Sequence, residues 1–189
     1  MKWKIECKIW ENENSNKEIS FVFEHVAELF SKLIPQEPPL GYKSIVLVND
    51  LFYDHRIYCP IHPEYYKIGL NTGQKNYGKA MYEFTHELTH VYCDPRINNW
   101  LTETMSHVAS FHVLDVLAKK WEDTPPEGTG QYVHDMLRCF KVDLVREAYH
   151  KIDLIQHQVS DNWIKKEVKN IHACPELGNH IIYNVFALE

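Results

Sequence analysis

The clearest chemical signal in this chain of 189 residues is the segment His86-Glu87-Leu88-Thr89-His90. Residues i and i+4 of an α-helix project from the same face, so His86 and His90 can bind one tetrahedral zinc ion. Glu87 then lies beside the metal's open position, where a carboxylate can take a proton from water. The spacing therefore predicts a zinc site with a general base, which is the chemistry of metal-assisted hydrolysis.

A helix must carry this segment, and the flanking residues predict one over about residues 76 to 93. Tyr77 to Phe84 contains no proline, and its only glycine is near the start. Asp94-Pro95 ends the helix, because the residue before a proline avoids the α region. Just upstream, residues 65 to 72 are rich in aromatic and β-branched side chains and end at a turn signal, which predicts a strand.

A catalytic zinc site needs a third protein ligand, and Glu103 is the residue that we expect to supply it. Residues 98 to 110 open a second predicted helix, which runs to about Trp121 and carries Glu103 in its first turn or two. Small side chains follow Glu103 and would let this helix approach the first one closely. These small residues are Ser106, Ala109 and Ser110.

Three other residues near the segment are of types that bind zinc. His107 lies one turn beyond Glu103 on the same helix face and is the main alternative ligand. His112 is a weaker alternative. Cys93 follows His90 by three residues, which turns it partly away from the metal, and we expect it to be a small apolar residue instead.

The pairing of His86-Glu87-Leu88-Thr89-His90 with a helix that begins Trp100-Leu101-Thr102-Glu103 resembles the gluzincin group of zinc metallopeptidases, particularly its small single-domain members. The resemblance covers roughly residues 40 to 115. It implies that an edge strand before the helix, here residues 65 to 72, holds the substrate. The site residues that it implies are the zinc ligands His86, His90 and Glu103 and the base Glu87.

Two features differ from that group. The gap from His90 to Glu103 is shorter than in its best-known members. His107 stands where many of them place an aspartate that supports a zinc ligand.

The fold expected from the chain is α+β and zincin-like, with a small mixed sheet. Alternation from Trp3 to Ile9 predicts a strand. An apolar stripe from Ile19 to Leu33, preceded by a capping box of Ser15 and Glu18, predicts a helix. Further strands are expected over Ser44 to Val48, near Phe52 to Tyr58 and, as the edge strand before the active-site helix, over residues 65 to 72. This order favours a sheet with its helices on one side.

The second half of the chain is expected to be helical and to form the lower lobe of the cleft. Apolar residues recur at helical spacing from Tyr132 to about Tyr149, with a further helix near 162 to 171 and a tail over 181 to 186. Asp123 to Gly130 is a polar break and a possible cover for the cleft. Available donors to a developing oxyanion are Arg146, Tyr149, His150, His180 and Tyr183.

Length and composition predict one domain over residues 1 to 189, with its sheet in about 1 to 95 and its helical part in about 96 to 189. The hydrophobic content is 44% and the aromatic content 13%, enough for one substantial core. The net charge of −6 argues against a nucleic-acid partner. No apolar run approaches a membrane span, and the five scattered cysteines read as reduced thiols, so we expect a cytoplasmic protein without a membrane partner.

Three functional classes follow from these patterns. The first is a Zn²⁺-dependent peptidase acting on a peptide or protein substrate, with Glu87 as its catalytic residue. The second is a catalytically silent zincin-like module that binds zinc or has a regulatory role, although a purely structural zinc would not require Glu87. The third is a helical structural protein with an accidental motif, and metal content would distinguish it from the other two.

Overall fold

The computed structural model describes residues 2–52, 55–97 and 99–153. It is a mixed α/β structure whose described part contains a four-stranded sheet and four helices. The strands are β1 (Ile5–Lys8), β2 (Ser44–Asn49), β3 (His55–Ile57) and β4 (Tyr65–Leu70). The helices are α1 (Glu13–Leu33), α2 (Tyr77–Cys93), α3 (Trp100–Asp123) and α4 (Val133–Asp153). The helix expected near residues 162 to 171 and the tail over 181 to 186 lie outside the described residues.

The sheet has the order β1-β2-β4-β3 and is mixed, as the sequence predicted. β1, β2 and β4 are parallel to one another, and β3 runs antiparallel to β4. The register aligns buried residues across the parallel strands, with Ile5 beside Ile45, and Leu47 between Cys7 and Ile68. This row of apolar side chains forms the face of the sheet that packs against the helices.

The prediction that residues 65 to 72 form the edge strand is wrong. Their strand, β4, lies between β2 and β3, and the edge strand of this side is β3. The physical reason is that β3 turns back on β4 as an antiparallel neighbour and covers its free side. Consistent with an internal position, Ile68, Gly69 and Leu70 are all buried.

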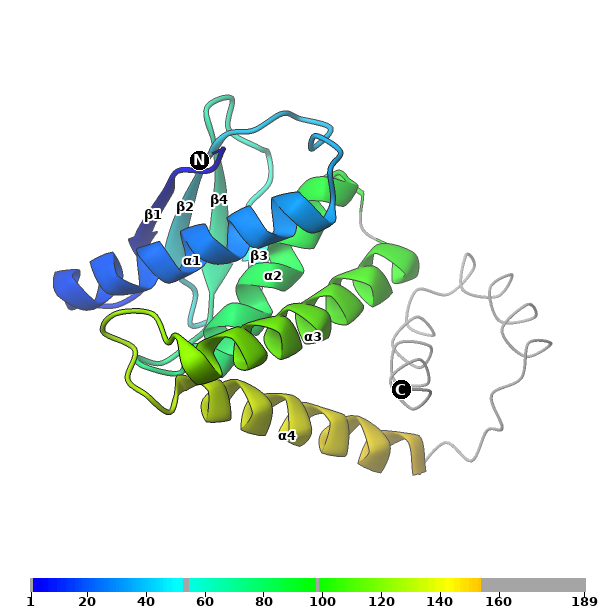
Figure 1. Ribbon diagram of the computed structural model, residues 1–189. Helices are drawn as coiled ribbons and strands as arrows, with labels where there is room; N and C mark the ends of the chain where they lie inside the picture. The colour runs from blue at the N-terminus through cyan, green and yellow to red at the C-terminus, as the bar shows by residue number, and fades with distance from the viewer. Residues whose placement is uncertain (1, 53–54, 98, 154–189) are drawn as a thin grey trace.

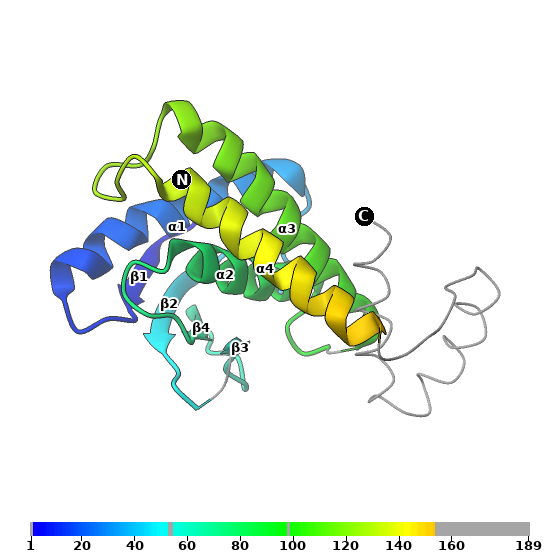
Figure 2. The ribbon, with the colours of Figure 1, turned by 90° about the horizontal axis from the view of Figure 1, so that it is seen from below.

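The helices lie on one side of the sheet in two layers (Figures 1 and 2). α1 packs on β1 and α2 packs on β3 and β4, whereas α3 and α4 pack on α2. The hydrophobic core is continuous from Trp3, just before β1, to Ala148 on α4. None of the described helices is both long enough and apolar enough to cross a membrane.

The helix ends follow local signals, with one correction at α1. That helix begins after Asn12, whose side chain accepts a hydrogen bond from the Ser15 backbone N–H, so the capping box predicted for Ser15 and Glu18 is wrong. Asn12 precedes Ser15 and offers a better acceptor for the first turn. α2 ends at Cys93, directly before Asp94 and its proline, as expected.

Gly69 on β4 allows a buried carboxylate to reach the edge strand. The Asp50 side chain crosses Gly69 and accepts hydrogen bonds from Arg56 Nε at 2.8 Å and from the Tyr58 hydroxyl at 2.7 Å. A Cβ added at Gly69 would lie 2.9 Å from Asp50 Cβ and 3.1 Å from Tyr58 Cε2. A side chain at position 69 would therefore disturb the contacts that hold β3.

We expect Gly69→Ala to lower the free energy of unfolding by about 1–3 kcal/mol, the usual cost of overpacking a tight site. Gly73→Ala is the matched control, because a Cβ there meets nothing within 4 Å. The control should change stability by less than about 0.5 kcal/mol. Urea denaturation measures both, and equal effects of the two substitutions would contradict the steric argument.

Candidate metal centre

The paired histidines lie on α2, which is buried on nearly every side. His86 and His90 are 2% and 8% exposed, and their ring centroids are 5.0 Å apart. The two Nε2 atoms face each other at 3.2 Å. One helical turn has therefore brought two ring nitrogens to a common point, as the i, i+4 spacing predicts.

Glu103 reaches the same point from the first turn of α3. This helix begins with a capping box, in which Asn99 accepts from the Thr102 backbone N–H and Thr102 accepts from Asn99. The Glu103 carboxylate then lies against both histidines, with Oε2 at 3.1 Å from His86 Nε2 and Oε1 at 3.3 Å from His90 Nε2. The three residues predicted as zinc ligands are therefore brought together.

Small side chains allow this close approach of the two helices. Ser106 and Ser110 are fully buried, and the Ser110 hydroxyl donates to the Tyr82 backbone carbonyl of α2 at 3.1 Å. A larger residue at either serine would separate the helices. Ser106 and Ser110 therefore play the part expected from the sequence, whereas Ala109 is only partly buried.

The spacing of the three side chains suits a tetrahedral zinc ion. Ligand atoms that lie about 2.0–2.1 Å from such an ion are about 3.3 Å from one another. The observed separations among His86 Nε2, His90 Nε2 and the Glu103 oxygens are 3.1, 3.2 and 3.3 Å. A neutral imidazole pair with one carboxylate is also a donor set that zinc accepts.

The local electrostatics favour the protonation states that a metal requires. Burial lowers the pKa of His86 to about 4, so its ring is neutral near pH 7. Burial alone would raise the pKa of Glu103, but hydrogen bonds to His86 and His90 outweigh it and hold that pKa well below its usual range. The site therefore presents a neutral imidazole and an ionised carboxylate.

Glu87, the residue predicted to act as base, lies beside the three predicted ligands. It is 4% exposed and lines the same cavity of about 190 Å³ as His86, His90 and Glu103. Its Oε1 accepts a hydrogen bond from His55 Nδ1 on β3 at 2.6 Å. Burial would lower the pKa of His55, but the hydrogen bond and the charge of Glu87 raise it overall.

His55 is the site residue that the sequence analysis missed. It precedes Glu87 by 32 positions and belongs to a strand of three residues. No spacing pattern links a lone histidine on a short strand to a motif on a later helix. Only the pairing of β3 with β4, beside α2, brings His55 to Glu87.

His107, the main alternative ligand, also lies at the site. Its Nδ1 is hydrogen-bonded to the Tyr82 hydroxyl, and its ring meets the His86 ring edge-on with centroids 4.7 Å apart. Burial lowers the pKa of His107 to about 3. Ligand atoms of His86, Glu103 and His107 fall within 4.8 Å of one another, as do those of His55, His86 and Glu87.

The other residues weighed from the sequence lie elsewhere or outside the described part. His112 is exposed on α3, and Cys93 belongs to neither group of neighbouring donors within the described residues. Arg146 is exposed and bonds to Asp143. Cys7, Cys59, Cys93 and Cys139 are free thiols. The calls on Tyr149 and His150 concern side chains outside the described set, and those on His180, Tyr183 and Cys174 fall on undescribed residues.

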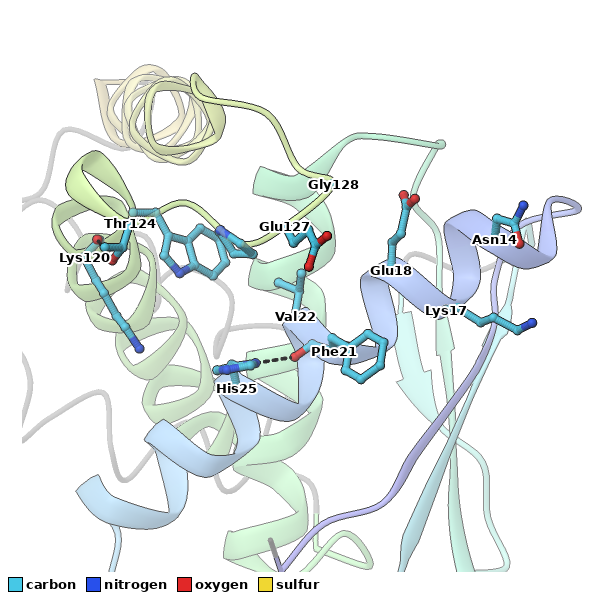
Figure 3. A pocket seen from close by; sticks show the side chains of 12 residues that line it. Asn14, Lys17, Glu18, Phe21, Val22, His25, Lys120, Thr124, Glu127 and Gly128 are labelled. Atoms are coloured by element: carbon cyan, nitrogen blue, oxygen red, sulfur yellow. Dashed lines mark hydrogen bonds between the residues drawn. The ribbon is translucent and has the colours of Figure 1, made fainter.

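The predicted cover, Asp123 to Gly130, is far from the site, so that prediction is wrong. It follows the far end of α3, about 20 residues or 30 Å along the helix axis from Glu103. The loop instead borders a different cavity of about 840 Å³, whose lining also includes Trp121 and residues of α1. Figure 3 shows Thr124, Glu127 and Gly128 of the loop beside Glu18 and Val22 of α1. Proline and glycine content located a loop correctly but carried no information about which end of α3 faces the metal centre.

Comparison of the chain with protein-family models, with curated proteins and with solved structures produced no match. The function must therefore be inferred from the geometry of the site.

We expect Glu103→Gln to weaken zinc binding by more than the roughly 10–100-fold typical of residues that only support a ligand. His86→Ala combined with His90→Ala should abolish stoichiometric binding. His112→Ala, an exposed histidine on the same helix as Glu103, is the control and should bind zinc like the unchanged protein. Elemental analysis and competition with a chelator provide the measurement.

The same experiment distinguishes the two possible third ligands. If Glu103→Gln keeps full zinc affinity while His107→Ala loses it, His107 is the ligand. If the double histidine variant keeps its metal, the centre lies elsewhere.

Proposed function

We propose that this protein is a zinc-dependent peptidase with a zincin-like fold. The observation that carries the proposal is the convergence of His86, His90 and Glu103 at 3.1 to 3.3 Å, with Glu87 on the wall of the same cavity. A purely structural zinc site completed by Glu103 would not need Glu87 as a second carboxylate beside it. The resemblance to gluzincins supports the same assignment, with the same residues in the same roles.

The proposed reaction divides its work among the described residues. A zinc ion held by His86, His90 and Glu103 would supply a Lewis acid that polarises the scissile carbonyl and increases the acidity of water. Glu87 accepts the proton of the attacking water and delivers it to the leaving amine. Burial of Glu87 keeps this proton transfer away from bulk solvent.

The substrate is proposed to bind along β3 instead of residues 65 to 72. β3 is the edge of the sheet, and His55, Arg56 and Ile57 all line the cavity of the metal centre. An extended peptide can add to such an edge through backbone hydrogen bonds. This mode places a peptide bond, and not an isolated small molecule, in front of Glu87.

The main alternative remains a silent zinc-binding or regulatory module. It shares the metal centre and differs in having no turnover. The interaction of Glu87 with His55 is the observation that favours this alternative, because one oxygen of the proposed base is already engaged. The cytoplasmic location and the absence of a nucleic-acid partner remain predictions from composition and charge.

We expect Glu87→Gln to retain about one zinc per chain and to lower peptide hydrolysis by about 10²–10⁴-fold, the usual contribution of a general base. Glu64→Gln, at an exposed glutamate before β4, is the matched control and should retain activity. Release of fragments from casein and from a mixed peptide library, followed by mass spectrometry, measures both. Zinc-loaded protein that cleaves neither substrate set would favour the silent module, and equal rates for Glu87→Gln and the unchanged protein would exclude Glu87 as base.

A further inference from the structure

We infer that His55 is a positioning residue for Glu87, so that the edge strand β3 orients the base as well as bordering the substrate cavity. This inference rests on the proposed function for its catalytic consequence. The contact itself is a property of the fold: His55 Nδ1 donates to Glu87 Oε1 at 2.6 Å, and the two side chains are 17% and 5% exposed.

Helix geometry explains why Glu87 needs a partner from another element. Successive residues of an α-helix are rotated by about 100°, so Glu87 does not project from the shared face of His86 and His90. A glutamate side chain also has several rotamers, and burial without a partner would be unfavourable for its charge. The hydrogen bond from His55 to Oε1 selects one rotamer, and in the proposed reaction the second oxygen would accept the proton of the attacking water.

β3 can hold Glu87 because its opposite face is anchored to the sheet. Alternation along the strand directs Arg56 away from the side of His55. Arg56 and Tyr58 both bond to Asp50, which is 4% exposed and directly follows β2. The strand is therefore fixed through Asp50 on one face and meets Glu87 on the other.

A role for His55 as a zinc ligand fits the geometry less well. The donor atoms of His55, His86 and Glu87 lie within 4.8 Å of one another, which makes a metal group conceivable. However, 2.6 Å between His55 Nδ1 and Glu87 Oε1 is a short hydrogen-bond distance. Two ligands of one tetrahedral zinc would be about 3.3 Å apart.

The experiment compares His55→Ala with His55→Asn in the chain of 189 residues. The Asn side-chain amide places an N–H close to the position of Nδ1, so it can restore the hydrogen bond that Ala removes. His62→Ala is the matched control, since His62 is an exposed histidine in the loop after β3 that stacks on Tyr65 and does not line the cavity. For each variant we measure zinc content, kcat and KM on the peptide substrate, and the ring N–H proton of His55 by NMR where it is present.

All three variants should bind about one zinc per chain. His55→Ala should lower kcat by about 10–100-fold with little change in KM, as expected when a supporting hydrogen bond is lost, and His55→Asn should recover most of that loss. In the protein with His55 intact, the ring N–H proton should resonate far downfield, move upfield in Glu87→Gln and lose its protection from exchange in Glu87→Ala.

Loss of zinc in His55→Ala would overturn the inference in favour of a ligand role. An unchanged kcat in His55→Ala, or a failure of His55→Asn to restore activity while it remains folded, would also overturn it. The NMR signal tests the contact independently of catalysis. If the zinc-loaded protein cleaves no peptide but the signal of the His55 ring proton changes on Glu87 substitution, the proposed function fails and the positioning contact stands. If that signal is the same in the Glu87 variants and the unchanged protein, the contact itself is refuted.

Discussion

The close packing of α3 on α2 is the constraint on which the candidate metal centre depends. Ser106 and Ser110 are fully buried between the helices, and the hydrogen bond from Ser110 to the Tyr82 carbonyl closes the contact. Glu103 lies one turn before Ser106, so the same approach brings its carboxylate to the two histidines. Without this approach, His86 and His90 would be buried polar groups lacking their carboxylate partner, which is an unfavourable state.

The central part of α2 buries polar side chains at positions where apolar ones would stabilise the fold more. Apolar residues at these positions would avoid the cost of desolvating polar groups. Instead, the helix buries a dense polar set, and local departures of this kind are typical of functional sites. The buried polar residues of this stretch are Glu83, Thr85, His86, Glu87, Thr89 and His90.

The edge strand β3 has only three residues, but it connects the sheet to Glu87. It pairs with β4, binds Asp50 through Arg56, and meets Glu87 through His55. Gly69 makes room for the Asp50 side chain in this arrangement. The position of the proposed base is therefore linked to the sheet through side-chain contacts of a strand that alone would be too short to be stable.

Local patterns in the sequence were sufficient for the parts of this protein that local forces determine. The i, i+4 pair of His86 and His90, the end of α2 before Pro95 and the start of α3 before Glu103 all follow from helical periodicity and capping, which act over a few residues. The strands expected from Trp3 to Ile9 and from Ser44 to Val48 were visible as apolar alternation and an apolar run. A third was expected near Phe52 to Tyr58, and β3 occupies His55–Ile57 within that range.

The tertiary structure alone decided which of these elements meet. It made β3, and not β4, the edge strand. It brought His55 to Glu87 and placed His107 beside His86. It also put the loop after Asp123 at the end of α3 that is remote from the candidate metal centre. These outcomes depend on strand order and helix packing between residues tens of positions apart. A short sequence pattern contains no information on such contacts, because they are set by which buried surfaces fit together in the folded chain.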